Sequence, residues 1–348
     1  MSATAGRLRR EIAALSPGYG AWVMATGIVS TGLALVREAA LSDALFVIAC
    51  LAFALLLVAY VWRAVGYRQR ALADARDPSR AFGYFSMVAA ANVIAVRLAL
   101  ARDPTAALVL GAASVPVWLV LTYGILGAMV IGRRAGSMLP GVNGSWFLLV
   151  VATQSLSVTS SIVGASHPAL TRAMAALAVA LWAIGVVLYL MLAVVVTLHL
   201  LELDHAPHAL SPTYWIYMGA TAISVLAAAR ILQFPASLPV IAATRDVVSG
   251  LGFLLWAFGS WWMPLLLGFA IGRHVILHEH LRYEPAWWSM VFPLGMYAAA
   301  STAYGRTGHM GFMVDIARGE VWLGFAAWLG VAGAMIGSLL RPPPDPSS

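Results

Sequence analysis

Three polar side chains recur with helical spacing inside one long apolar stretch of the chain. Gln154, Ser157 and Ser161 stand at positions i, i+3 and i+7, which places them on one face of a helix. Neutral amide and hydroxyl donors can replace the hydration shell of an anion without trapping it. The same donors also form hydrogen bonds between packed helices. The spacing therefore leaves two roles open, a polar pathway and helix-to-helix hydrogen bonding.

Basic residues follow several of the apolar stretches. Arg97, Arg230 and Arg306 fall near or just past the predicted outer ends of three stretches, and Arg37 and His167 occupy the comparable place in two more. A ring of arginines at a pore mouth raises the local concentration of anions. Arginines at helix ends also reach toward the membrane surface with no further role. Both interpretations stay open on the sequence alone.

Other chemistries find little support in the residues. Acidic residues stand only in predicted loops or at helix ends, which disfavours a proton relay or a sodium site within the membrane. No phosphate-binding loop, nucleophile elbow or intramembrane zinc motif occurs. We expect no enzyme activity, no cofactor and no metal, so a membrane redox subunit is the least favoured alternative. The histidines that could imitate a metal cluster lie in predicted inside loops or at helix ends: His199, His205, His208, His274, His278 and His280.

The elements that must position these residues are membrane helices. Of the 348 residues, 61% are hydrophobic and 10% charged, and the mean hydropathy is +0.86. Soluble domains average about a quarter charged residues. Apolar stretches recur along the chain, and about 18 such residues suffice for a bilayer core of roughly 30 Å. We predict an all-α integral membrane protein with ten transmembrane helices, at Pro17–Val36, Ala44–Ala64, Tyr84–Leu100, Ala106–Ile131, Ser145–Val163, Ala173–His199, Pro212–Ala229, Val247–Ile271, Trp287–Tyr304 and Val321–Leu340.

The charge distribution predicts the topology. All 21 Lys and Arg residues are arginines, and they are densest in the first two segments on the N-terminal side of the membrane. The positive-inside rule then places both termini in the cytoplasm and the chain in the plasma (inner) membrane. Topology accounts for the net charge of +7, so no nucleic-acid partner is expected. The chain, 1–348, is predicted to be a single transmembrane domain with a cytoplasmic segment at 1–16 and a disordered tail at 341–348.

The predicted helices alternate in chemistry. Odd-numbered ones carry small and hydroxyl residues, while even-numbered ones are apolar almost all round. Polar groups are unfavourable in lipid unless paired or hydrated, so the odd helices should form an inner ring and the even helices an outer one. Short links pair neighbours as five helical hairpins. Small residues also serve close packing alone, but the segregation along the whole chain favours a central pore. Its candidate polar lining is Gln154, Ser157, Ser161, Thr26, Asn92, Thr221 and Ser301.

Three segments carry a resemblance to a known family. The segment PAWWSMVFPLGMYAAAST, from Pro285 to Thr302, resembles the ninth-helix signature of the tellurite-resistance/dicarboxylate transporter family. MATGIVSTGL, from Met24, and GSWFLLVVATQSLSV, from Gly144, are similar to its first and fifth helices. That family belongs to the voltage-dependent anion channel superfamily, with bacterial tellurite-resistance proteins, malic acid and sulfite transporters and plant slow anion channels. The resemblance implies five hairpins around a pore, a homotrimer in membrane lipid, and C4-dicarboxylates, sulfite, chloride, nitrate or tellurite as substrates.

The resemblance also implies a phenylalanine that occludes the pore, and Phe292 takes its place. Its neighbour Pro293 removes a backbone donor in mid-helix and tends to bend the helix. A bulky ring beside a bend can close a pathway by excluding water; without the resemblance, an ordinary packing contact would be the simpler interpretation. We therefore predict a channel or uniporter-like transporter for small anions, with a proton-coupled malate or sulfite transporter as the alternative. Its predicted pore-mouth residues are Arg97, Arg230 and Arg306.

Overall fold

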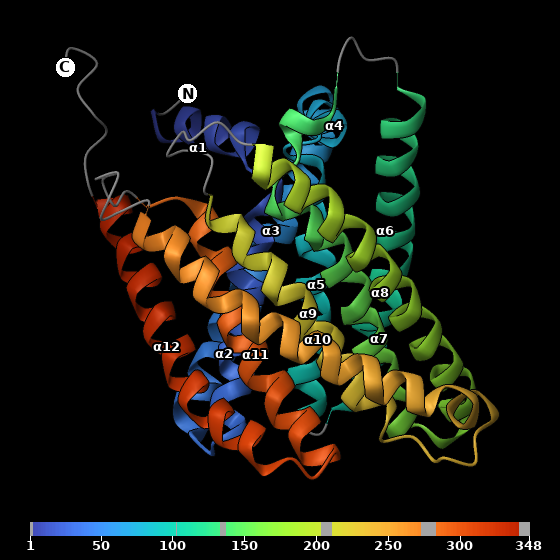
Figure 1. The fold of residues 1–348 in the computed structure, drawn as a ribbon. Coiled ribbons are helices and arrows are strands. Elements are labelled where there is room, and N and C mark those ends of the chain that lie inside the picture. Colours follow the sequence, from blue (N-terminus) through green and yellow to red (C-terminus); the bar gives the residue numbers. More distant parts are fainter. Residues whose placement is uncertain (1–2, 102, 133–136, 203–210, 273–282, 341–348) are drawn as a thin grey trace.

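A computed structural model of the chain describes residues 3–101, 103–132, 137–202, 211–272 and 283–340 (Figure 1). Helices make up nearly all of these ranges, and no strand occurs within them. Two short helices, α1 (Ala3–Ala14) and α4 (Arg68–Arg76), lie at one end of a bundle. The bundle consists of α2 (Gly20–Leu35), α3 (Ala39–Gly66), α5 (Phe85–Leu100), α6 (Pro104–Ile131), α7 (Leu148–Ser166), α8 (Thr171–Glu202), α9 (Trp215–Ile231), α10 (Pro239–Ile271), α11 (Trp288–Thr307) and α12 (Gly311–Leu340).

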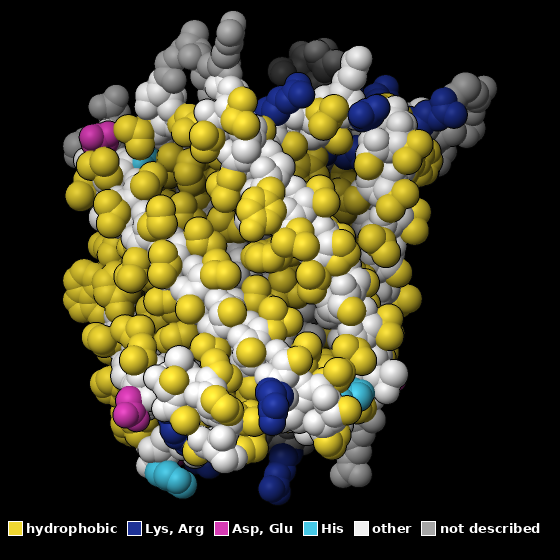
Figure 2. Space-filling view, turned by 90° about the vertical axis from the view of Figure 1, so that its right-hand side faces the viewer, with side chains coloured by type: hydrophobic (Ala, Val, Ile, Leu, Met, Phe, Trp, Pro, Cys, Tyr) yellow, Lys and Arg dark blue, Asp and Glu magenta, His cyan; other side chains and the backbone are white. Residues whose placement is uncertain are grey.

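The outer surface of the bundle suits a lipid bilayer. Figure 2 shows a broad band of apolar side chains, with charged side chains gathered at its two ends. Within the described ranges, nine helices are long and apolar enough to cross a membrane. The remaining long helix, α11, has 20 residues and is less apolar, with polar residues such as Ser289, Ser301 and Arg306. The prediction of an all-α membrane protein is confirmed.

Neighbouring helices pack as hairpins. The pairs in contact are α2 with α3, α5 with α6, α7 with α8, α9 with α10 and α11 with α12. In the first pair, two serines exchange hydrogen bonds with each other's backbone: Ser30 Oγ donates to Ser42 O at 2.7 Å, and Ser42 Oγ to Ser30 O at 2.8 Å. Each hydroxyl thus satisfies a carbonyl oxygen of the opposite helix, which holds the hairpin together where no water can reach.

One helix of each hairpin belongs to an inner ring. Around the axis, α2 contacts α5, α5 contacts α7, α7 contacts α9, α9 contacts α11, and α11 contacts α2. The most apolar stretches of α7 and α9 are 94% buried, whereas those of α10 and α12 are 22% and 17% buried. Because inner helices are covered on every side, they tolerate hydroxyl groups and need small residues, while the outer helices face lipid with apolar side chains.

The inner helices are much shorter than the outer ones. Inner helices have 16 to 20 residues and outer helices 28 to 33. The outer helices α10 and α12 begin at Pro239 and Gly311 rather than at the predicted Val247 and Val321. The sequence prediction therefore placed Glu320 outside a helix, whereas it lies ten residues into α12. The predicted helix bounds lie where the apolar sequence ends. A helix can continue into the polar region beyond it, because its backbone groups stay hydrogen-bonded within the helix.

A buried ionic cluster ties α3 and α4 to the short turn Ala81–Tyr84, which leads into the second inner helix, α5. Arg63 of α3 is 2% exposed and forms an ion pair with Asp74 of α4. Arg63 Nη1 also donates to Tyr84 Oη at 2.9 Å, and Arg80 Nε lies 3.1 Å from Asp74 Oδ1. The carboxylate of Asp74 thus joins two arginines, and this fixes the position of Arg80 near the end of the inner ring.

Candidate functional site

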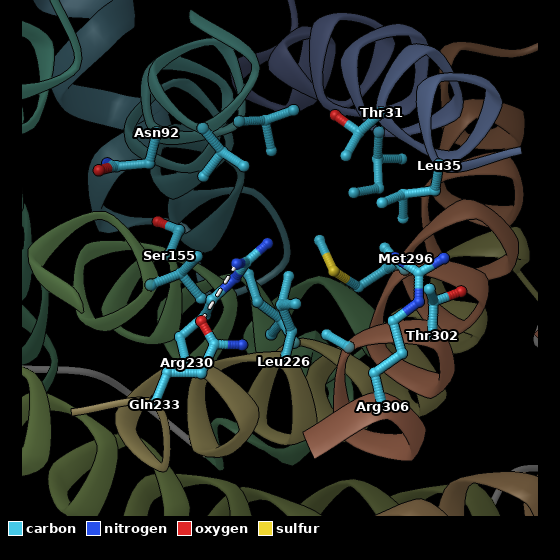
Figure 3. A pocket seen from close by; sticks show the side chains of 17 residues that line it. Thr31, Leu35, Asn92, Ser155, Leu226, Arg230, Gln233, Met296, Thr302 and Arg306 are labelled. Atoms are coloured by element: carbon cyan, nitrogen blue, oxygen red, sulfur yellow. Dashed lines mark hydrogen bonds between the residues drawn. The ribbon is translucent and has the colours of Figure 1, made fainter. Parts of the chain in front are cut away.

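A cavity of about 120 Å³ lies within the inner ring (Figure 3). We call it the axial cavity, because each of the five inner helices contributes to its wall. Most of the wall is apolar, with side chains such as Ile28, Val93 and Met296. The polar residues of the wall are Thr31, Asn92, Ser155, Arg230, Gln233, Thr302 and Arg306.

Two arginines at the ends of α9 and α11 give the axial cavity its charge. Arg230 and Arg306 both border it in Figure 3. Arg230 Nη1 donates to Gln233 Oε1 at 3.4 Å, while its buried Nε has no hydrogen-bond partner in the described part of the chain. No Asp or Glu is among the described residues of this wall. Arginines in a wall that contains no carboxylate favour anions.

The opposite end of the inner ring consists of five 3₁₀ turns, each of which leads directly into an inner helix. Successive turns contact one another around the axis, and the last contacts the first, so they form a closed turn ring. Glycine permits this close packing: a Cβ atom at Gly83 would lie 2.8 Å from the backbone nitrogen of Gly18. The turns of this ring are η1 (Pro17–Tyr19), η2 (Ala81–Tyr84), η4 (Gly144–Phe147), η7 (Pro212–Tyr214) and η9 (Pro285–Trp287).

The turn ring surrounds a second hollow of about 260 Å³, which we call the turn-ring vestibule. Its wall includes residues next to or within all five turns. On α11, Ser289 belongs to the vestibule wall and Met296 to the wall of the axial cavity. These two residues are seven positions apart, or about 10 Å at roughly 1.5 Å per helical residue. The two hollows therefore follow each other along the same ring of helices.

Phe292 lies on α11 between the residues that border the two hollows. It is 1% exposed. Gly219 of α9 lies against Phe292 and Pro293, since a Cβ atom there would be 2.8 Å from Pro293 Cγ and 3.4 Å from Phe292 Cε1. Any larger residue than glycine at position 219 would displace this part of α11. The phenylalanine predicted as the gate is thus held by packing at the level between the axial cavity and the vestibule.

Arg97, the third predicted pore-mouth arginine, is engaged in the wall of the first hairpin. Its Nε donates to Ser30 Oγ at 3.2 Å, and its Nη2 donates to Ser42 Oγ at 3.0 Å and to Asp43 Oδ1 at 2.6 Å. Its guanidinium carbon lies 5.1 Å from the ring centroid of Phe46. The side chain is 7% exposed. These contacts tie α5 to α2 and α3, so the positive charge of Arg97 is already neutralised.

Residues 14–336 match the sequence pattern of a family described as voltage-dependent anion channel. The match covers nearly the whole chain, including all ten long helices apart from the last turn of α12. The chain belongs to the voltage-dependent anion channel family. The resemblance that three sequence segments indicated is confirmed by this match.

This member of the voltage-dependent anion channel family has relatives in bacteria and archaea. An uncharacterized membrane protein of Mycobacterium tuberculosis (strain H37Rv) is 40% identical over 141 residues, which cover 40% of this chain and 71% of that protein. An uncharacterized transporter of Methanocaldococcus jannaschii is 26% identical over 338 residues and 90% of both chains. A second transporter of that archaeon is 27% identical over 192 residues and 54% of both chains. The family and these relatives support anion transport in general.

Several polar residues predicted to line the pore of this family member contact outer helices. Gln154 Nε2 donates to the carbonyl of Trp182 on α8 at 3.2 Å, and Ser157 Oγ donates to the carbonyl of Ala178 at 2.7 Å. Gly185 of α8 provides the space for Gln154, because a Cβ atom there would lie 2.5 Å from Nε2. These two side chains therefore form the helix-to-helix hydrogen bonds that the sequence left open as an alternative.

Thr26, Thr221 and Ser301 also face the outer ring. Trp328 of α12 donates its indole N–H to Thr26 Oγ1 at 3.0 Å, and Trp256 of α10 donates to Ser301 Oγ at 2.8 Å. Thr221 packs against Gly259 of α10, because a Cβ atom at Gly259 would lie 2.4 Å from Thr221 Oγ1. Several hydroxyl groups of the inner ring thus bind outer helices to it.

The hydroxyl residues that border the axial cavity differ from those predicted to line the pore, and two of them, Ser155 and Thr302, directly follow a predicted residue. Asn92 was predicted and does border the cavity, but its Nδ2 donates to Ser114 Oγ of α6 at 2.9 Å, and its side chain turns toward that helix (Figure 3). Thr31, Ser155 and Thr302 border the cavity and were not among the predicted lining residues. Ser155 follows the predicted Gln154 by one position, which rotates it by about 100° around the helix. The run of polar residues in the sequence could not show whether Gln154 or Ser155 faces the axis.

Ser161 borders a third hollow, beside the axial cavity. This side hollow of about 210 Å³ lies among the ends of α5, α7 and α9 and shares Arg230 and Gln233 with the axial cavity. Ser161 Oγ donates to the carbonyl of Ser157 at 3.0 Å. Ser161 therefore lies near the cationic end of the inner ring without facing the axial cavity itself.

No group of three or more His, Cys, Asp or Glu residues suited to a metal ion occurs among the residues that the structure describes. His205, His208, His274, His278 and His280 lie outside the described ranges. Cys50, the single cysteine, is half-buried and unpaired. The described part of the chain thus offers no candidate metal centre.

Proposed function

We propose that the chain conducts small anions across the membrane along the axis of its inner ring, as a channel or a uniporter-like transporter. The observation that carries this proposal is the wall of the axial cavity. All five inner helices contribute to it, and its charged members are Arg230 and Arg306, with no carboxylate among its described residues. Cations would meet unscreened positive charge there, whereas anions would be attracted.

We further propose that Phe292 is the gate of this pathway. Phe292 stands on α11 between Ser289 of the vestibule wall and Met296 of the axial cavity wall, and its ring packs against Gly219 of α9. An apolar constriction blocks ions because a narrow apolar passage does not hold the water that an ion needs. Opening would then require the ring to turn aside or α11 to shift near its proline.

The proposed substrates are small inorganic anions and C4-dicarboxylates, including tellurite, which the family resemblance implies. Proteoliposomes that contain the purified protein would be compared for efflux of chloride, nitrate, sulfite and malate. At least one anion should leave faster than from protein-free liposomes, and cations should not. A protein that is correctly folded and inserted but releases none of these anions would contradict the proposal.

Uncoupled movement is favoured over the proton-coupled transport of malate or sulfite. The described walls of the axial cavity and the vestibule consist of neutral side chains and arginines, whereas a proton relay needs side chains that exchange protons. A pH gradient imposed on proteoliposomes without an anion gradient separates the two. Accumulation of malate or sulfite against its own gradient would establish the coupled alternative.

We also propose that both termini face the cytoplasm at the inner membrane. The helix α1 and the end of α12 lie at the same end of the bundle (Figure 1), and the arginines of α4 lie at that end as well. Such an arginine excess is typical of the cytoplasmic side. Reporter fusions to the C-terminus should be active only in the cytoplasm; activity in the periplasm would reverse the topology.

Assembly as a homotrimer, with one pathway in each subunit, is part of the same proposal. It comes from the family resemblance, and closed cyclic symmetry is the usual form of such assemblies. Chemical cross-linking in native membranes should yield a limiting product of three chains. Full anion flux from a protein that stays monomeric in the bilayer would argue against it.

A further inference from the structure

The turn-ring vestibule is surrounded by the N-termini of all five inner helices. Each 3₁₀ turn continues without a break into an inner helix, and the five continuous helical segments have about the same direction relative to the vestibule. The N-terminus of a helix carries roughly half a positive charge, because its first N–H groups lack partners within the helix. Five such ends around one hollow make it positive without any contribution from side chains.

Three of the turns begin with a capping side chain that also borders the vestibule. The side-chain oxygen accepts a hydrogen bond from the backbone nitrogen two residues later, which satisfies one of the free N–H groups at each turn. The remaining partial charge of these helix ends still points into the hollow. The three pairs, with their distances, are Ser16 with Gly18 (3.4 Å), Asn143 with Ser145 (2.8 Å) and Ser211 with Thr213 (3.3 Å).

An unpaired buried hydroxyl provides independent support for a ligand. Ser145 belongs to the vestibule wall and is 9% exposed, yet its Oγ has no hydrogen-bond partner in the described ranges. Its backbone nitrogen is already used by Asn143, so the hydroxyl is the donor left over. A buried polar group without a partner is unfavourable and rare in folded proteins. A bound anion would accept its hydrogen bond.

Ser289 supplies a second hydroxyl from α11. It is 6% exposed and borders the same vestibule, and its Oγ makes no hydrogen bond with any described residue. The charged residue of the described wall is Arg80, which Asp74 holds through a 3.1 Å contact. No carboxylate belongs to that wall. The two serines therefore belong to a wall that contains no carboxylate to accept a hydrogen bond from them.

We propose that the turn-ring vestibule is a second anion-binding site, in which the hydroxyls of Ser145 and Ser289 and the N-termini of the inner helices hold a small inorganic anion of halide size. The hollow of about 260 Å³ is many times larger than the roughly 10–15 Å³ of cavity volume that one water molecule needs. An anion can therefore bind there while it keeps part of its hydration shell. The site would be part of the proposed anion pathway, so its effect on transport rests on the proposed function.

Bromide is the probe for the binding test, because its anomalous X-ray scattering locates it directly. Crystals of the full-length protein grown in bromide should show an anomalous peak in the turn-ring vestibule. The combined variant Ser145→Ala/Ser289→Ala should lose most of this peak, since each hydrogen bond to a charged group changes affinity by about tenfold or more. A wild-type vestibule without bromide would overturn the proposal, whether or not the protein conducts anions.

Ser145→Asp tests the same site without weakening the fold. A carboxylate in the first turn of a helix is stabilised by the helix dipole, so this variant should unfold at the same temperature as the wild type or higher. The tethered carboxylate should occupy the place of the anion and abolish the bromide peak. Bromide density in the Ser145→Asp vestibule equal to that of the wild type would contradict the proposal.

Ser79→Ala is the matched control. Ser79 borders the same vestibule, but its hydroxyl is already bonded to Asp77 Oδ1 at 2.8 Å. Its removal should leave the bromide peak unchanged. An equal loss of bromide in Ser79→Ala and in Ser145→Ala/Ser289→Ala would show that the effect is not specific to the free hydroxyls, and would refute their role.

Flux measurements separate this inference from the proposed function. With chloride added on the side of the turn ring, Ser145→Ala/Ser289→Ala should raise the half-saturating concentration by about tenfold or more, with little change for chloride added on the other side. Bromide binding without any flux would support the site and contradict conduction. Flux with equal half-saturation in variant and wild type, from both sides, would contradict the site.

Discussion

The two ends of the inner ring present positive charge by different means. At the turn ring, the backbone N-termini and the serine hydroxyls face the vestibule. At the other end the same helices present their C-termini, which carry roughly half a negative charge each. Arg230 and Arg306 stand in the last turns of α9 and α11, where their charges offset those carbonyl ends. In a ring of parallel helices, only the end that presents the C-termini thus needs arginine side chains in order to be positive.

This difference predicts how each end responds to change. Backbone partial charges persist in every variant that folds, whereas the charge of an arginine disappears with one substitution. The end with arginines should therefore be the easier one to alter by mutation or by salt. The turn-ring end should respond mainly to changes that fill the vestibule or remove its hydroxyl donors.

Phe292→Ala should have the largest effect, because the ring lies between the two ends. Its removal should raise anion flux at least about tenfold, equivalent to a barrier lower by about 1.4 kcal/mol. Reconstituted flux measures this change. Phe147→Ala is the control, since Phe147 is also fully buried but its ring packs against Tyr189 of α8 and Tyr217 of α9. Equal flux in Phe292→Ala and wild type would show that the ring does not limit conduction.

Arg230→Gln/Arg306→Gln should have the next largest effect and should depend on salt. At about 0.01 M salt, where charges act over about 30 Å, flux should fall about threefold, and at 1 M, where they act over about 3 Å, it should hardly change. Arg172→Gln is the control, because Arg172 is an exposed arginine at the start of the outer helix α8. A loss of the same size at both salt concentrations would assign the two arginines a structural role.

Arg97→Gln should change stability more than flux. It removes the bonds to Ser30, Ser42 and Asp43, and hydrogen bonds to charged groups contribute about 1.5–3 kcal/mol each when buried, less for the exposed Asp43. The melting temperature should fall by several degrees, while flux per folded protein should stay within about twofold at low salt. A salt-dependent loss of flux like that of the Arg230 and Arg306 variants would return Arg97 to the pore mouth.

Gln154→Met should have the smallest effect on flux. Methionine has a similar volume, and the substitution removes one hydrogen bond to α8, which in membrane proteins is worth about 0.6 kcal/mol on average. Flux and anion preference should match those of the wild type, with a slight loss of thermal stability. A change in the order of preference among chloride, nitrate and malate would place Gln154 on the pathway after all.

The sequence predicted the division into inner and outer helices, because that division depends on burial. Hydroxyl groups are favourable within the membrane mainly where protein covers and pairs them, so the pattern separates α7 from α8 without any knowledge of contacts. The register within a helix could not be obtained in this way. Gln154 and Ser155 are equally buried, and only the position of Gly185 on α8 decides which of the two turns outward.

The turn ring was not predicted either. Its signal is visible afterwards in the proline and aromatic residues that open several inner helices, such as Pro17 and Tyr19 or Pro212 and Tyr214. The closure of the ring depends on backbone contacts between segments far apart in the sequence, such as Gly144 against Thr213. Likewise, the bonds of Arg97 depend on Ser42 and Asp43 in the first turns of α3, whose position beside α5 the spacing along one helix does not reveal.

The short inner helices have a consequence for the membrane electric field. Where water fills the axial cavity and the turn-ring vestibule, the transmembrane potential falls mainly across the segment between them. On α11 this segment runs from Ser289 to Met296, about 10 Å at roughly 1.5 Å per residue, compared with a bilayer core of roughly 30 Å. A potential of 100 mV, worth about 2.3 kcal/mol per elementary charge, would therefore act within about 10 Å of Phe292, and an anion that passes the ring would experience a field about three times stronger than in a uniform bilayer.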